Sequence, residues 1–164
     1  TKATYVGGFY PHNEVAGAVH LTVQGVPAQI QLNRLEEIRE RVGYWRKANQ
    51  IHRWFVENVQ GGEDECGEHE VSLEQLLILQ SLCRQVLGEF EIEVRNADNL
   101  DELEVPMEVQ ERGANLLPSR SGFFFGGTDY NGWYMYQLVQ TIDIIEALKE
   151  EKMDNAWFVY RSSW

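Results

Sequence analysis

The sequence has few cysteines and few prolines, and it has no long apolar run. Its 164 residues include two cysteines and four prolines. Cys66 and Cys83 are too few to form the disulfide framework of a small secreted domain. No apolar run is long enough to span a bilayer, and no signal-peptide pattern occurs. These absences favour a reducing cytoplasm and no association with a membrane.

Basic residues are also scarce. Fourteen Lys and Arg residues oppose 26 Asp and Glu residues, which gives a net charge of −12. Because nucleic acids and anionic membranes are polyanions, we expect neither to bind this chain directly. Hydrophobic residues make up 43% of the chain and aromatic residues 12%, which excludes a disordered chain and is enough for a core. The length favours one domain.

One helix, predicted at residues 44–60, is expected to form the centre of the protein. Five residues at helical spacing would share one of its faces: Trp45, Ala48, His52, Phe55 and Val59. Basic residues fall on or near the opposite face. Two glycines at 61–62 would end the helix. The same helix would therefore supply both core contacts and a basic surface.

Residues 1–32 are predicted to form an extended segment followed by a β-hairpin. Apolar and polar residues alternate at 15–23 and at 28–32, and the sequence QGVP at 24–27 is a turn signal. Residues 33–164 would then form a helical core with a C-terminal strand. Asn33 is a plausible N-cap for a short helix that begins at Arg34 and ends or kinks near Gly43.

A second long helix is predicted after an acidic loop at 63–70. Ser72 and Gln75 have the spacing of a capping box, and apolar residues recur at helical spacing from Leu73 to Leu87. Residues 89–95 alternate between acidic and apolar, which favours a strand, although the preceding helix could run on through them. A short helix at 106–115 could follow, ended by Gly113 or Asn115.

The last third of the chain contains three consecutive Phe residues bounded by glycines, in the segment 121–130. This pattern predicts a short buried strand and then a tight turn. Thr128, Asp129 and Asn131 could each cap a final helix at 132–152. Residues 156–164 are predicted to be the last strand. The elements together predict an α+β fold in a single domain over 1–164, with a small, mostly antiparallel sheet packed against about four helices.

Charge is uneven along the chain. Six of the fourteen basic residues lie between Arg34 and Arg53, whereas the stretch from Glu63 to Glu111 has fifteen acidic residues and two arginines. A solvated surface with helix salt bridges is the ordinary explanation. The alternative is an acidic patch that binds a basic partner protein.

His52 lies within the apolar face of the central helix, where Trp45 also lies. If the His52 imidazole is buried, it needs a hydrogen-bond partner. It is therefore either a satisfied core histidine or a residue that binds a ligand or transfers a proton. Both residues are candidate binding residues.

Asp129, Tyr130 and Trp133 are the other candidate binding residues, because they flank the glycine turn before the last helix. Aromatic side chains with a few polar groups are typical of ligand pockets. The walls of such a pocket would be Phe124, Tyr130, Trp133 and Trp157. A tight turn followed by a helix cap explains the same residues without a ligand.

Metal and catalytic signatures are incomplete. Cys66 and His69 have a spacing that suits one edge of a zinc site, and Cys83 could contribute, but a second close pair is absent. We therefore predict no metal site and no cofactor, and these three residues remain candidates only. Ser119 and Ser121 lack the spaced His and Asp partners of a nucleophile, so no catalytic residue is predicted.

Several segments resemble a signature found in small proteins of tailed bacteriophages and prophages. They are GYWRKANQIHRWFV at 43–56, DEC at 64–66, LLP at 116–118, GFFFGGTDY at 122–130 and YRSSW at 160–164. The resemblance covers residues 26–164. It implies a phage-derived protein that acts inside an infected bacterium, and it implies no particular reaction, cofactor or catalytic residue.

The leading hypothesis for function is an accessory protein that binds a basic host or phage protein through its acidic surface. One alternative is a small-ligand or nucleotide binder, with hydrolysis as a variant, whose pocket lies between the central helix and the 123–130 turn. Another alternative is a minor virion component.

Overall fold

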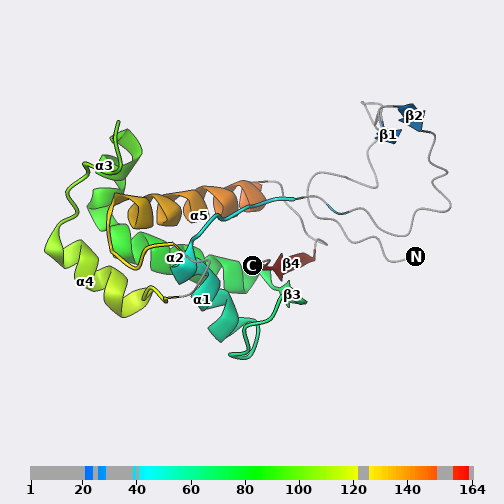
Figure 1. Cartoon of the computed structure of the whole chain (residues 1–164), viewed down its shortest axis with the longest axis horizontal. Helices are drawn as coiled ribbons and strands as arrows, with labels where there is room; N and C mark the ends of the chain where they lie inside the picture. The colour runs from blue at the N-terminus through cyan, green and yellow to red at the C-terminus, as the bar shows by residue number, and fades with distance from the viewer. Residues whose placement is uncertain are drawn as a thin grey trace.

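The computed structural model describes residues 21–23, 26–28, 39, 41–121, 126–150 and 157–162. The elements, in chain order and as labelled in Figure 1, are β1 (Leu21–Val23), β2 (Val26–Ala28), α1 (Asn49–Asn58), β3 (Glu68–Val71), α2 (Leu73–Leu87), the 3-10 turn η2 (Gly88–Phe90), α3 (Glu91–Asn96), α4 (Met107–Leu116), α5 (Gly132–Glu150) and β4 (Phe158–Arg161). The predicted α+β class is confirmed, and both described strand pairs are antiparallel.

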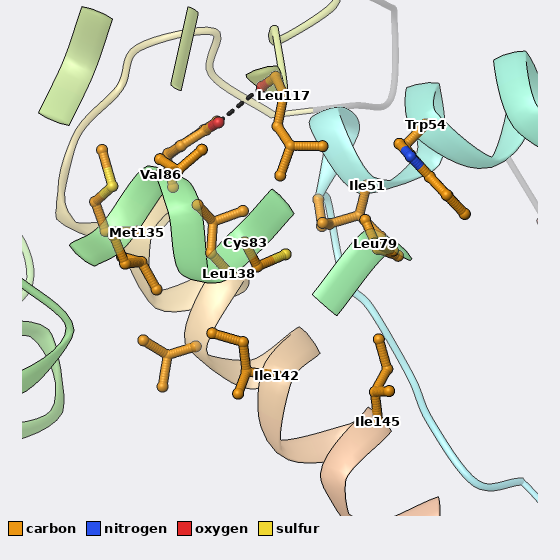
Figure 2. Packing of buried hydrophobic residues seen from close by; sticks show 14 of the residues in the cluster. Ile51, Trp54, Leu79, Cys83, Val86, Leu117, Met135, Leu138, Ile142 and Ile145 are labelled. Carbon is orange, nitrogen blue, oxygen red and sulfur yellow. Dashed lines mark hydrogen bonds between the residues drawn. The ribbon is translucent and has the colours of Figure 1, made fainter. Parts of the chain in front are cut away.

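Helices α2 and α5 pack side by side, with α4 against α2 and α3 against α5 (Figure 1). Figure 2 shows side chains of α1, α2 and α5 pointing toward one another in the core. The predicted apolar face of α5 is buried along its length, at Met135, Leu138, Ile142, Ile145 and Leu148. Each such side chain stabilises the fold by about 1.5–3 kcal/mol relative to its exposed state.

The central helix begins later than predicted. It starts at Asn49 and not at residue 44, because Lys47 has a φ of 59°, in the left-handed region that a right-handed helix cannot include. The segment 41–48 instead runs across α5 as an extended strap (Figure 1). A Cβ atom at Gly43 would lie 2.9 Å from Cγ2 of Ile144, so the strap touches α5 closely there.

The predicted apolar face of the central helix nevertheless points inward. Ala48, His52 and Phe55 are buried, and Val59 is half-buried. Trp45, on the strap, is half-buried, and its Nε1–H donates to Oγ1 of Thr141 at 2.9 Å. Helical spacing therefore identified the inward-facing residues, although two of them, Trp45 and Ala48, lie before the helix.

The prediction of a loop throughout residues 63–70 is wrong at its end, because Glu68–Val71 form strand β3. It pairs antiparallel with β4, with Glu68 opposite Arg161 and Val71 opposite Phe158. The acidic residues of β3 have low strand propensity. Pairing with β4, and the burial of Val71 and Phe158 at the end of the ladder, favour the strand over a loop.

The strand prediction for 89–95 is wrong, and so is the alternative that the preceding helix runs on through them, although these residues are helical. Gly88, with a φ of 55°, ends α2, and then η2 and α3 follow. Phe90 and Val94 are buried, whereas Ile92 is 66% exposed. Burial every four residues is the pattern of a helix, not the alternation of a strand.

The remaining predictions agree in kind but differ in their limits. The N-terminal hairpin exists, although β2 begins at Val26, within the predicted turn. The short helix α4 ends at Leu116 and not at Gly113, which is buried: a Cβ atom there would lie 3.0 Å from the Tyr130 ring. The predictions for residues 1–20, for Phe123–Phe125 and for the boundary at residue 32 lie outside the described residues. Of the short helix predicted from Arg34 to Gly43, the structure describes residues 39 and 41–43, and these are not helical.

Candidate functional site

His52 is the centre of a chain of polar side chains from three separate segments. Its ring Nδ1 lies 2.6 Å from Oη of Tyr160 on β4, and its Nε2 lies 3.0 Å from Oδ1 of Asp64 in the loop before β3. Helix α1 positions His52, and the β3–β4 ladder positions Tyr160 beside it. The imidazole is 8% exposed and both of its nitrogens have partners.

The Tyr160 hydroxyl keeps its hydrogen. Burial raises the pKa of the Tyr160 phenol, and the nearby Asp64 carboxylate raises it further. The ring of Tyr160 stacks on Phe55 with centroids 3.9 Å apart.

A cavity of about 680 Å³ lies beside this chain. The strap 41–48, the N-terminal half of α1, the C-terminal half of α5 and strand β4 enclose it. Its walls are mostly apolar and include Trp45, Ile51, Phe55, Ile145, Leu148 and Phe158. Its polar side chains without formal charge include Tyr44, His52, Tyr160 and Ser162.

The charged residues at this cavity are all basic. Arg41, Arg46, Lys47 and Arg161 line it, and each is exposed. No carboxylate is among the described residues that line it. In a chain whose acidic residues outnumber its basic ones, this local excess of positive charge favours an anion.

A second hollow, of about 340 Å³, lies between the start of α1 and the glycine turn at 126–127. Here Nδ2–H of Asn49 donates to the carbonyl of Gly127 at 2.7 Å. A Cβ atom at Gly126 would lie 3.2 Å from Cβ of Lys47, so the turn lies directly against the strap. Arg46, Lys47, Asp129 and Trp133 line this turn hollow.

The five predicted binding residues do not converge on one site. Trp45 and His52 line the larger cavity, whereas Asp129 and Trp133 line the turn hollow. Tyr130 packs against Tyr134, with ring centroids 4.9 Å apart, and its hydroxyl accepts a hydrogen bond from the backbone of Ser119. Trp157 is 46% exposed and lines neither space.

Sequence reasoning missed the partners of His52 and the basic rim of the cavity. Asp64 lies twelve residues from His52, in a loop with several other carboxylates, and Tyr160 lies 108 residues away. The only signal was the general need of a buried imidazole for partners. Of the aromatic walls expected for a pocket near the turn, Trp133 lines the turn hollow, Tyr130 and Trp157 do not, and Phe124 lies outside the described residues.

The candidate metal ligands lie in different surroundings. Cys66 is exposed, whereas Cys83 is fully buried in the core and burial raises the pKa of its thiol. Nε2 of His69 lies 3.4 Å from a carboxylate oxygen of Glu65. Across the part of the chain that the structure describes, no three His, Cys, Asp or Glu residues are grouped as metal ligands.

The opposite end of the molecule carries an acidic surface, formed by η2, α3, α4 and the connection between α3 and α4. We define it by eight exposed carboxylates: Glu89, Glu93, Asp98, Asp101, Glu102, Glu104, Glu108 and Glu111. None of the eight is in ion-pair contact with a basic side chain of the described residues. The nearby Arg95 pairs with Glu91 and Asp143, and Arg112 donates to the backbone carbonyls of Val86 and Leu87.

An exposed aromatic pair borders the acidic surface. Trp133 is 48% exposed and Tyr136 is 42% exposed, and their rings meet edge to face with centroids 6.2 Å apart. Nε1–H of Trp133 donates to Oδ1 of Asp101 at 2.7 Å, which fixes the indole beside the carboxylates. Large exposed rings held in place by hydrogen bonds are typical of binding surfaces.

No family model, curated protein or solved structure matches this chain. None of the helices among the described residues is long and apolar enough to cross a membrane. The geometry of the chain itself therefore carries most of the functional proposal.

Proposed function

We propose that this chain is an accessory protein that binds a basic partner protein through the acidic surface. The phage-like segments support a setting inside an infected bacterium, where the partner would be a host or phage protein. The observation that carries the proposal is the group of eight exposed carboxylates that have no described cationic partner.

In the described part of the structure, the carboxylates of the acidic surface lack ion pairs with the arginines near them. Surface carboxylates in folded proteins often have Lys or Arg neighbours, and such exposed pairs contribute little to stability. The two arginines near the acidic surface have other partners: Arg95 pairs with Glu91 and Asp143, and Arg112 donates to backbone carbonyls. Eight exposed carboxylates within residues 89–111 make this part of the surface negative, and that charge would attract a basic partner and be neutralised by it.

The exposed aromatic pair, Trp133 and Tyr136, is the expected centre of the binding surface. A Lys or Arg side chain can lie over the face of Trp133 while its charge meets Asp101, which combines a cation–π contact with an ion pair. Trp, Tyr and Arg are the residues that most often dominate binding energy at interfaces. The pair at Trp133 and Tyr136 is therefore the expected anchor for a basic segment.

The test is capture of partners from a bacterial lysate with immobilised protein, followed by affinity measurement on the purified partner. The variant Asp101→Asn/Glu102→Gln/Glu104→Gln should lose the partner, because it neutralises the surface beside Trp133. The matched control Glu63→Gln/Glu70→Gln/Glu74→Gln removes the same charge elsewhere and should retain it. The affinity should also fall steeply as salt is raised. The proposal would be contradicted if both variants captured the partner equally well, or if the affinity did not change with salt concentration.

A second candidate function is the binding of a nucleotide or another small anion in the turn hollow. Arg46 and Lys47 line the hollow without a described ion-pair partner, and Trp133 offers a ring for stacking. Asp129 lines it as well and would repel an anion. A nucleotide at 100 times its Kd should add about 2.7 kcal/mol of stability. Thermal-shift assays with nucleotides and divalent metals test this, and no stabilisation by any of them argues against it.

A further inference from the structure

We infer that the cavity of about 680 Å³ beside His52 is a binding site for an amphipathic organic anion, with an apolar body and one carboxylate or phosphate head group. This site is separate from the acidic surface and does not depend on the proposed function. It is also distinct from the turn hollow, although Arg46 and Lys47 line both.

The size and walls of the cavity fit the apolar body of such a ligand. Pockets for small molecules have volumes of roughly 300–1,000 Å³ and mainly apolar walls. The apolar side chains that keep accessible surface at this cavity are Val42, Trp45, Ile144 and Val159, whereas Ile51 and Phe55 are almost fully covered by protein. An alkyl or aromatic group would bury its own surface against these accessible side chains.

The basic residues fit the head group. The four cations Arg41, Arg46, Lys47 and Arg161 are exposed, whereas most of the apolar lining residues are buried, so the positive charge lies at the open side of the cavity. Arg161 contacts Glu68 at 3.9 Å. Because the described lining residues include four cations and no carboxylate, an anionic group at the opening would meet net attraction.

The polar chain at His52 determines which end of the ligand enters. Nδ1 of His52 lies 2.6 Å from the Tyr160 hydroxyl and Nε2 lies 3.0 Å from Asp64, so these groups are engaged with one another. The Asp64 carboxylate behind the imidazole would repel an anion at this end of the cavity. The head group therefore lies at the basic opening, and the apolar body lies against Val42 and Trp45.

The first experiment is a calorimetric titration of the full chain with dodecanoate, dodecyl phosphate, dodecanol and dodecyltrimethylammonium, each below its micelle concentration. Saturable one-to-one binding of one or both anions is expected, and whichever binds more tightly identifies the head group. Dodecanol should bind more weakly and the cation should not bind. In the series octanoate, decanoate, dodecanoate, affinity should rise about two- to fourfold for each added CH₂.

The second experiment places the ligand. The variant Arg41→Gln/Arg161→Gln changes two cations that line this cavity and not the turn hollow, and it should weaken binding of the anion about tenfold. The matched control Arg53→Gln/Arg84→Gln removes two arginines that line neither space and should stay within about twofold, because exposed pairs contribute little.

Nuclear magnetic resonance then separates the two spaces. Addition of dodecanoate should shift the indole signal of Trp45, which lines the cavity, and leave that of Trp133 in place. The inference is overturned if no anion saturates the protein, if dodecyltrimethylammonium binds as well as dodecanoate, or if the Trp133 signal shifts while that of Trp45 does not.

Discussion

Replacement of Tyr160 by Phe should destabilise the protein through one lost hydroxyl. The variant keeps the ring that stacks on Phe55 at 3.9 Å, so packing changes little. It removes the partner of Nδ1 of His52, which lies 2.6 Å away in a side chain that is 8% exposed. The removal of one hydrogen-bond partner from a buried polar side chain costs about 1–3 kcal/mol.

Urea unfolding, followed by far-ultraviolet circular dichroism, measures this loss. With a slope of about 2 kcal/mol per M, the midpoint should fall by about 0.5–1.5 M. Tyr136→Phe is the matched control: its ring is 42% exposed, and the change should stay within about 0.5 kcal/mol. If Tyr160→Phe is as stable as the control, the hydroxyl does not satisfy His52 and the polar chain has no energetic role.

Three further predictions concern the helices, the thiols and the buried phenols. Ser72→Ala removes the hydrogen bond that the Ser72 hydroxyl accepts from the Gln75 backbone N–H and should cost about 1 kcal/mol in thermal unfolding; an unchanged melting temperature would contradict this. A thiol reagent should modify exposed Cys66 in the native protein and reach Cys83 only after unfolding; rapid modification of both would refute the core position of Cys83. Burial raises the pKa of Tyr134 and Tyr160 in the folded state, so their neutral forms stabilise it fully below the unfolded pKa of about 10. Stability should then fall by up to about 1.4 kcal/mol per pH unit for each phenol above that pH, and a flat profile in alkaline urea titrations would contradict it.

Features that depend on neighbours in sequence could be predicted. The Ser72–Gln75 capping box forms as its spacing indicates, with hydrogen bonds of 2.9 and 3.1 Å. The last helix begins after Asn131, whose side chain accepts from the backbone of Tyr134, so the correct cap was among the three candidates. These features need only a few adjacent residues, and their energetics are local.

Features that depend on distant contacts could not be predicted. The start of α1 is displaced because the strap packs on α5, where Gly43 meets Ile144. Strand β3 exists because β4, ninety residues later, pairs with it. His52 could be identified as a residue that needs partners, but Asp64 and Tyr160 reach it only through the fold. The basic opening of the cavity likewise joins the strap to β4.

The central claim, that the acidic surface binds a basic partner, is tested most directly by hydrogen–deuterium exchange on the purified complex. The account predicts slower exchange in residues 97–111 and at the start of α5, around Trp133 and Tyr136, with β3 and β4 unchanged. Slower exchange confined to β3, β4 and the strap, with residues 97–111 exchanging as in the free protein, would contradict it.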